Sequence, residues 1–341
     1  MPPFGLGRQP GWAPHVNQQY SNRLSVSTVW AKARSLEAAP HGPGPEAAAI
    51  LAVLDQLDLD LVELEYRLTG EVIERLLPEF KARGWRVSSL HNFAPLPVGV
   101  PRNKASGDLF NLAAPDREER ERAVEYTLRT MELASDQEAE AVVLHLGEVS
   151  EVAEKGVIRR GADAGAMIPE LAAHLEKRAL YAPRHMDAVS FSLERLAERA
   201  APLGVALGLE NRYHAYQIPS LPELTILLER FAGAPLGLWY DCGHAWVQER
   251  AGMEPASQWL DTLGAGLVGC HLHDAKGHDD HQAPGAGKMD WPALTAALAH
   301  APLKVLEVAS GAEAGQMREG AAMLAELFAQ AKRRERKEAS A

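Results

Sequence analysis

The sequence predicts a single-domain TIM barrel, an α/β fold in which eight parallel strands alternate with helices and long βα loops cover one end. Three observations lead to this fold class. Short apolar runs alternate with longer stretches of helical spacing, the alternation occurs eight times, and no glycine-rich phosphate-binding fingerprint follows the first run. Eight such repeats close into a barrel more readily than they form an open doubly wound sheet, which is the structural alternative.

Eight runs are expected to form the strands. Each is short and almost continuously apolar, as is typical of parallel strands that helices cover. The expected strands are 25–30, 59–65, 86–91, 141–146, 205–210, 236–241, 267–271 and 304–308.

Amphipathic stretches between these runs are expected to form the covering helices. Two long connections, 95–115 and 147–181, follow the third and fourth strands, and such βα connections usually roof the active site of a barrel. The clearest helical stretches are 71–83, 117–135, 188–201, 221–231 and 291–300.

No internal repeat or low-complexity linker divides the barrel. We expect an N-terminal arm (1–22), one barrel domain (23–330) and a charged C-terminal tail (331–341). The basic residues between 332 and 337 are interleaved with glutamate, which is typical of a solvated helix end.

Composition narrows the class of protein. A net charge of -11 argues against a nucleic-acid partner without excluding a local basic groove. The two cysteines, Cys242 and Cys270, are too few for a disulfide framework, so we expect a cytoplasmic protein. Residues 1–20 contain no apolar run, so neither a signal peptide nor a membrane segment is expected there. The sequence leaves open whether the protein forms a homo-oligomer.

Six successive expected strands end on a side chain that can bind a metal. Side chains at the C-terminal ends of barrel strands converge on one mouth, so residues far apart in the sequence can meet there. These residues are His91, His145, Glu210, Asp241, His271 and Glu307, and His244, Asp279 and His281 follow shortly after two of the strands.

A single histidine or glutamate at such a position is more often structural than a ligand. Six in succession weaken that interpretation, because chance would scatter ionisable residues over both ends of the barrel. Imidazoles and carboxylates together suit Zn, Mn, Co or Fe better than Ca. A set without thiolates also leaves positions open for water or substrate. The pattern therefore predicts a catalytic divalent-metal site.

These motifs resemble the xylose isomerase-like superfamily over about residues 24–330. The family contains sugar and sugar-phosphate isomerases and epimerases, together with endonuclease IV. The matching segments are 209–211, 241–245, 271–276, 279–281, 285–287, 290–291 and 306–307.

For the epimerase branch, the resemblance implies one divalent metal, Zn, Mn, Co, Fe or Mg, held by four residues, with His244 near the substrate. Both glutamates would also be the catalytic acid and base, moving a proton on opposite faces of a sugar, sugar phosphate or similar polyol. The chemistry is sound on its own terms, since a metal that polarises a carbonyl acidifies the neighbouring C–H. The four residues are Glu210, Asp241, His271 and Glu307.

For the endonuclease IV branch, the resemblance implies up to three zinc ions and phosphodiester hydrolysis, which is the alternative function. All nine candidate ligands fall on matching positions. Two features depart from that branch: Ala286 stands where many relatives carry glutamate, and no obvious basic and aromatic loops would grip a bent duplex. A metal-binding barrel without turnover is a third possibility, which the two glutamates disfavour.

Six further residues are expected near a small carbohydrate-like substrate. Glu65 and Lys276 could bind a hydroxyl or a phosphate, or form structural ion pairs. His273 follows a predicted ligand, and a hydrogen bond to a ligand imidazole is expected of it. The full set is Glu65, Asn92, Arg212, His214, His273 and Lys276.

Overall fold

The computed structural model describes residue 20 and residues 23–31 and 42–338. Almost all of the expected N-terminal arm lies outside the described residues. Within them, no helix is both long enough and apolar enough to cross a membrane.

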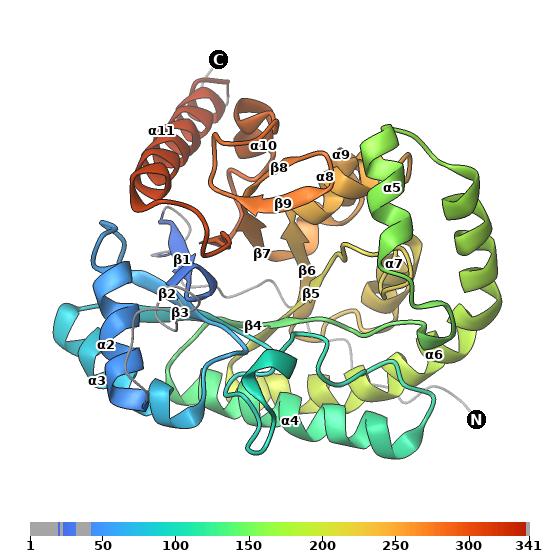
Figure 1. The fold of residues 1–341 in the computed structure, drawn as a ribbon, viewed down its shortest axis with the longest axis horizontal. Helices are drawn as coiled ribbons and strands as arrows, with labels where there is room; N and C mark the ends of the chain where they lie inside the picture. Colours follow the sequence, from blue (N-terminus) through green and yellow to red (C-terminus); the bar gives the residue numbers. More distant parts are fainter. Residues whose placement is uncertain (1–19, 21–22, 32–41, 339–341) are drawn as a thin grey trace.

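Eight parallel strands close into a barrel, which confirms the predicted fold class (Figure 1). Their order around the ring is β1, β10, β7, β6, β5, β4, β3 and β2. Each strand overlaps one of the eight predicted runs. The strands are β1 (Ser25–Ser27), β2 (Leu61–Leu64), β3 (Arg86–His91), β4 (Ala141–Leu144), β5 (Ala206–Glu210), β6 (Leu236–Asp241), β7 (Leu267–Leu272) and β10 (Leu303–Leu306).

Helices surround the strands, and a small antiparallel hairpin, β8 (Asp274–Lys276) and β9 (Asp279–Gln282), follows β7. Short 3₁₀ turns lie at Arg102–Lys104, Ser150–Val152 and Gly264–Gly266. The helices are α2 (Pro43–Leu54), α3 (Gly70–Arg83), α4 (Arg117–Asp136), α5 (Gly156–Ala164), α6 (Pro169–Leu203), α7 (Leu221–Arg230), α8 (Cys242–Arg250), α9 (Ala256–Leu263), α10 (Trp291–Ala297) and α11 (Ala314–Glu338).

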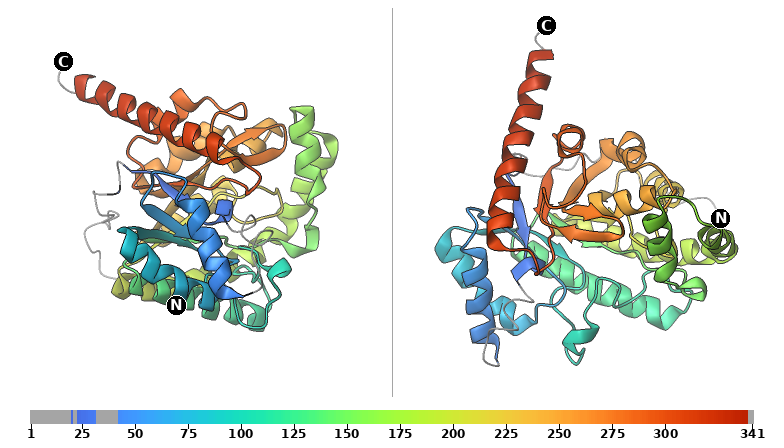
Figure 2. Two further views of the ribbon diagram at one scale, coloured as in Figure 1. Left: turned by 60° about the vertical axis from the view of Figure 1, so that its left-hand side comes forward. Right: turned by 45° about the horizontal axis from the view of Figure 1, so that its top comes forward.

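One helix is longer than predicted, and another lies outside the predicted helical stretches. Helix α6 begins at Pro169, where proline suits the first turn, so the predicted helix 188–201 is only its second half. Helix α11 spans Ala314–Glu338, and its last turns extend beyond the barrel (Figure 2). The basic run 332–337 therefore lies on a solvated helix end, as predicted.

Strand alternation divides the side chains of the barrel between two environments. Leu61, Val143 and Trp239 pack together in one buried cluster, whereas Val62 and Leu64 belong to the larger cluster that the helices cover. The C-terminal strand ends are left for polar side chains. Both predicted long connections contribute to the cavity at this end, which is consistent with their expected role as a roof.

Candidate metal centre

Four of the predicted ligands form a buried group that we call the deep centre: Glu210, Asp241, His271 and Glu307. They lie at or next to the C-terminal ends of β5, β6, β7 and β10, and their ligand atoms are within 4.8 Å of one another. His271 Nδ1 is 3.1 Å from Glu210 Oε1, 2.9 Å from Glu307 Oε2 and 3.6 Å from Asp241 Oδ2. None of the four is more than 5% exposed.

The charges of the deep centre act strongly on one another. Burial would raise the pKa of Glu210, but His145 and neighbouring imidazoles hold that pKa well below its usual value. Burial would likewise raise the pKa of Glu307, and His271 and His281 keep it well below its usual value. Burial would lower the pKa of His271, yet the charges of Glu307 and Glu63 raise it well above the usual value. Ionised carboxylates thus create a negative potential that suits a divalent cation.

Backbone geometry fixes Asp241 where β6 passes directly into α8. Its Oδ1 accepts a 2.7 Å hydrogen bond from the backbone N–H of His244, as a helix N-cap does. The side chain of Asn211 bonds both the N–H and the C=O of Asp241, which ties β5 to β6. Sequence reasoning did not assign this role to Asn211, although it directly follows a predicted ligand.

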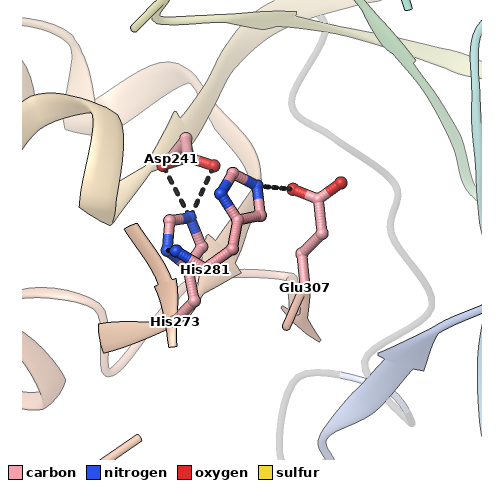
Figure 3. A group of neighbouring side chains, drawn as sticks. All are labelled: Asp241, His273, His281 and Glu307. Carbon is pink, nitrogen blue, oxygen red and sulfur yellow. Dashed lines mark hydrogen bonds and ion pairs between the residues drawn. The ribbon is translucent and has the colours of Figure 1, made fainter. Parts of the chain in front are cut away.

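His273 holds Asp241 from the other side (Figure 3). Its Nδ1 accepts a hydrogen bond from the backbone N–H of His281 at 2.8 Å, so Nε2 carries the hydrogen and donates to both oxygens of Asp241 at 3.0 Å. His273 therefore bonds a ligand carboxylate rather than a ligand imidazole. Only glycine fits at 243, because a Cβ there would lie 2.1 Å from Cε1 of His273.

Two outer groups flank the deep centre. The His91 group consists of His91, His145 and Glu210, with His145 Nε2 2.7 Å and His91 Nε2 3.7 Å from Glu210 Oε2. His91 Nδ1 donates to the backbone carbonyl of Asn92, which leaves Nε2 free to face the site. Gly107 belongs to the long connection 95–115, which we call the first roof loop. It lies close against both rings, since a Cβ there would be 2.7 Å from each.

The His281 group consists of His244, Asp280 and His281. His281 Nδ1 is 3.1 Å from Asp280 Oδ1, and His281 Nε2 is 3.4 Å from Glu307 Oε2. His244 Nδ1 donates to the carbonyl of Asn211, which directs Nε2 toward Asp280 at 3.7 Å. Burial would lower the pKa of His281, but Asp280 and Glu307 raise it well above the usual value.

Asp279 is the one predicted ligand that lies outside these groups. Its side chain is 72% exposed and lies 3.4 Å from His278 Nε2, whereas Asp280 takes the place in the site. Successive residues of a strand point to opposite faces, so Asp279 and Asp280 cannot both face the cavity. His281 has a φ of 55°, and this break in the strand lets its ring join Asp280 on the same side.

The first roof loop supplies an unpredicted carboxylate, Asp108. It accepts hydrogen bonds from Arg212 Nη2 on both oxygens, at 3.0 and 2.9 Å, and lies 3.0 Å from His145 Nδ1. Gln217 also donates to it. Burial opposes its charge, but Arg212 and His145 lower the pKa of Asp108. Its position inside a long loop gave no sequence signal for this role.

A cavity of about 430 Å³ opens above the deep centre. Glu210 and Glu307 are among the residues that line it, whereas Asp241 and His271 are not. The roof loops contribute Ser106, Asp108, Glu148, Ala153 and Lys155. The two glutamates are thus the members of the deep centre that a molecule in this cavity would meet.

Two of the six predicted substrate residues, Arg212 and His214, line the cavity. Asn92 instead bonds Thr127 and Thr130 of α4, and Glu65 pairs with Arg67. Neither side chain is among the residues that line the cavity.

Lys276 is exposed on β8 and is not among the cavity-lining residues, and His273 lies behind Asp241. The two cysteines, Cys242 and Cys270, are fully buried. Burial raises the pKa of both thiols, so neither supplies a thiolate.

Fold and site together define a TIM barrel with a buried carboxylate and imidazole centre at its strand ends. The chain belongs to the xylose isomerase-like TIM barrel family, whose model matches residues 51–327.

Among curated proteins, the chain is similar to a probable endonuclease 4 of Natranaerobius thermophilus. The two are 29% identical over 208 residues, which cover 56% of this chain and 63% of the relative, so less than two thirds of that relative is matched.

Among solved structures, the chain is similar to an L-ribulose 3-epimerase. The TM-score is 0.65 at 17% identity, with 94% of this chain and 98% of the other covered. A D-tagatose 3-epimerase-like protein gives a TM-score of 0.64 at 18% identity, covering 92% and 99%. At these identities the likeness shows the fold.

Proposed function

We propose that the protein is a divalent-metal-dependent isomerase or epimerase of a small polyhydroxylated molecule: a sugar, a sugar phosphate or a similar polyol. One observation carries this proposal: Glu210 and Glu307 line the cavity, while Asp241 and His271 lie behind them. A divalent cation held by the four residues would supply Lewis acidity, which polarises a carbonyl and acidifies the neighbouring C–H. The mix of carboxylate and imidazole donors fits Mn, Co, Zn or Fe.

The two glutamates approach the cavity from different sides. They follow β5 and β10, which are three positions apart in the eight-strand ring. The low pKa values of both groups keep them ionised. One carboxylate would take a proton from one face of the substrate and the other would return a proton to the opposite face, which inverts the carbon. The cavity volume is in the range of small-molecule sites.

Solvent exchange tests this function. The purified protein, loaded with Mn²⁺ or Co²⁺, is incubated in D₂O with D-tagatose, L-ribulose and their phosphates, and the sugars are examined by NMR. We expect deuterium at the carbon next to the carbonyl, and much slower incorporation with Glu307→Gln. Hydrolysis of bis(p-nitrophenyl) phosphate without deuterium in any of the sugars would overturn the proposal.

A second candidate is a multinuclear phosphodiesterase. Two observations favour it: the outer groups add ligands beyond one ion, and a curated relative is named as an endonuclease. The cavity disfavours it, because Arg212 is already neutralised by Asp108 and Glu210 and is thus a weak anchor for a polyanion. Metal content separates the two, since about one Mn, Mg or Co per chain supports the epimerase and about three Zn or Fe support the hydrolase.

A further inference from the structure

Glu63 is a buried carboxylate that the reaction described above does not use. It lies on β2 and is completely buried. Strand alternation places it two residues beyond Leu61, on the same inward side and one step nearer the mouth. The sequence did not indicate a role for Glu63, because it lies inside an apolar run and before the end of the predicted strand.

Among the described residues, Glu63 hydrogen-bonds two side chains. Ser89 Oγ donates to its Oε2 at 2.8 Å, and His271 Nε2 lies 3.3 Å from both of its oxygens. Nδ1 of the same ring faces Glu210, Asp241 and Glu307. A histidine that binds a cation through one ring nitrogen carries its hydrogen on the other, so a cation at Nδ1 would place the hydrogen on Nε2, where Glu63 can accept it.

Packing holds the ring of His271 in this orientation. The ring of Trp239 meets it edge-on, with centroids 5.1 Å apart and an interplanar angle of 71°. Burying a carboxylate such as Glu63 is costly unless it is paired. An apolar residue would fill the same space in the barrel at lower cost, so the carboxylate calls for an explanation beyond packing.

We propose that Glu63 is a positioning residue, which holds His271 as the Nε2–H tautomer so that Nδ1 can bind a divalent cation in the deep centre. The inference rests on the proposed metal-dependent function. Histidine ligands commonly donate their second N–H to a carboxylate, and loss of that partner weakens metal binding about 10- to 100-fold. His145, with Asp108 behind its Nδ1, shows the same arrangement in the His91 group.

Zinc affinity, measured by competition with a chelator, tests the proposal without any substrate. We expect Glu63→Leu, which offers no acceptor, to weaken the tightest site about 10- to 100-fold. Glu63→Gln keeps an oxygen that can accept from Nε2, and it should restore most of the affinity. Glu223→Gln is the matched control, because Glu223 is also a buried carboxylate but pairs with Arg178 and belongs to none of the three ligand groups. It should bind zinc as the wild type does.

A spectroscopic measurement separates positioning from a general loss of structure. In the zinc-loaded protein with ¹⁵N-labelled histidine, the His271 ring should show a protonated Nε2 and a metal-bound Nδ1. Glu63→Leu should lose this signature while Glu63→Gln retains it. Unchanged zinc affinity and an unchanged His271 tautomer in Glu63→Leu would overturn this inference and leave the proposed function untouched. A wild-type protein that binds no divalent metal would instead overturn the proposed function.

Discussion

The deep centre and the His281 group differ in what holds them. Asp241, His271 and Glu307 lie on or beside barrel strands and are almost inaccessible, whereas Asp280 and His281 sit on the β8–β9 hairpin and are partly exposed. Strand ends are fixed by the closed barrel, while a hairpin depends on its own turns. We therefore assign the proposed reaction to the deep centre, and the residues of the His281 group would serve any further ion.

The largest expected effect concerns the deep centre. Replacing Glu307 with glutamine keeps its shape but removes the base, and kcat/KM for isotope exchange should fall roughly 10²- to 10⁴-fold. Glu210→Gln should have an effect of the same order, and circular dichroism should confirm that both variants fold. Full activity of both variants with metal bound would show that neither glutamate moves the proton.

A matched pair in the hairpin tests the outer groups. Asp280→Asn should weaken the binding of any metal beyond the deep-centre ion about 10- to 100-fold, an effect comparable to losing a partner of a ligand. Asp279→Asn should leave metal content unchanged, because that side chain is 72% exposed and outside the site. Plasma mass spectrometry of the purified variants measures both. The opposite ranking would mean that Asp279 is the ligand after all.

Asp279 and Asp280 also show which part of the site the sequence alone does not predict. The ends of β3, β5 and β6 follow from apolar runs, so ligands such as His91, Glu210 and Asp241 could be predicted directly. The choice between Asp279 and Asp280 depends on the left-handed backbone of His281, which no apolar pattern encodes.

Long-range contacts account for the other differences. Asp108 lies in a long loop, and the folded loop brings it to Arg212 in the site. Asn92 hydrogen-bonds a hydroxyl group of α4 instead of facing the cavity. The early start of α6 at Pro169 arises because much of the second long connection is itself helical. Such contacts form only once the chain has closed around the barrel.

The roof loop should contribute to stability as well as to the His91 group. Asp108→Asn removes a charged acceptor from Arg212 and His145, and we expect a loss of about 2 kcal/mol in the free energy of unfolding, as is typical of hydrogen bonds to charged groups. Urea denaturation measures this loss. Asp163→Asn, an exposed partner of His278, is the control and should change little. Equal stability of both variants would mean that Asp108 does not hold the roof.

The smallest expected effect is a pH dependence from the cavity wall. Burial and the charge of Arg212 lower the pKa of His214 to about 4, below its ordinary value of 6.5. The unfolded chain therefore binds this proton more readily between pH 6.5 and 4, so the stability of the wild type should fall as the pH falls through that window. His214→Gln should flatten the fall in thermal midpoint, and identical pH profiles would remove His214 as its source.

Stepwise removal of metal tests the central contrast most directly. The zinc-loaded wild-type protein is titrated with a chelator of moderate affinity, and the ions released per chain are followed by a colorimetric indicator. We predict that one ion, held by the buried deep centre, leaves last and most slowly, after any ion of the partly exposed His281 group. Loss of every ion at the first additions of chelator, or the absence of any tightly held ion, would contradict this prediction.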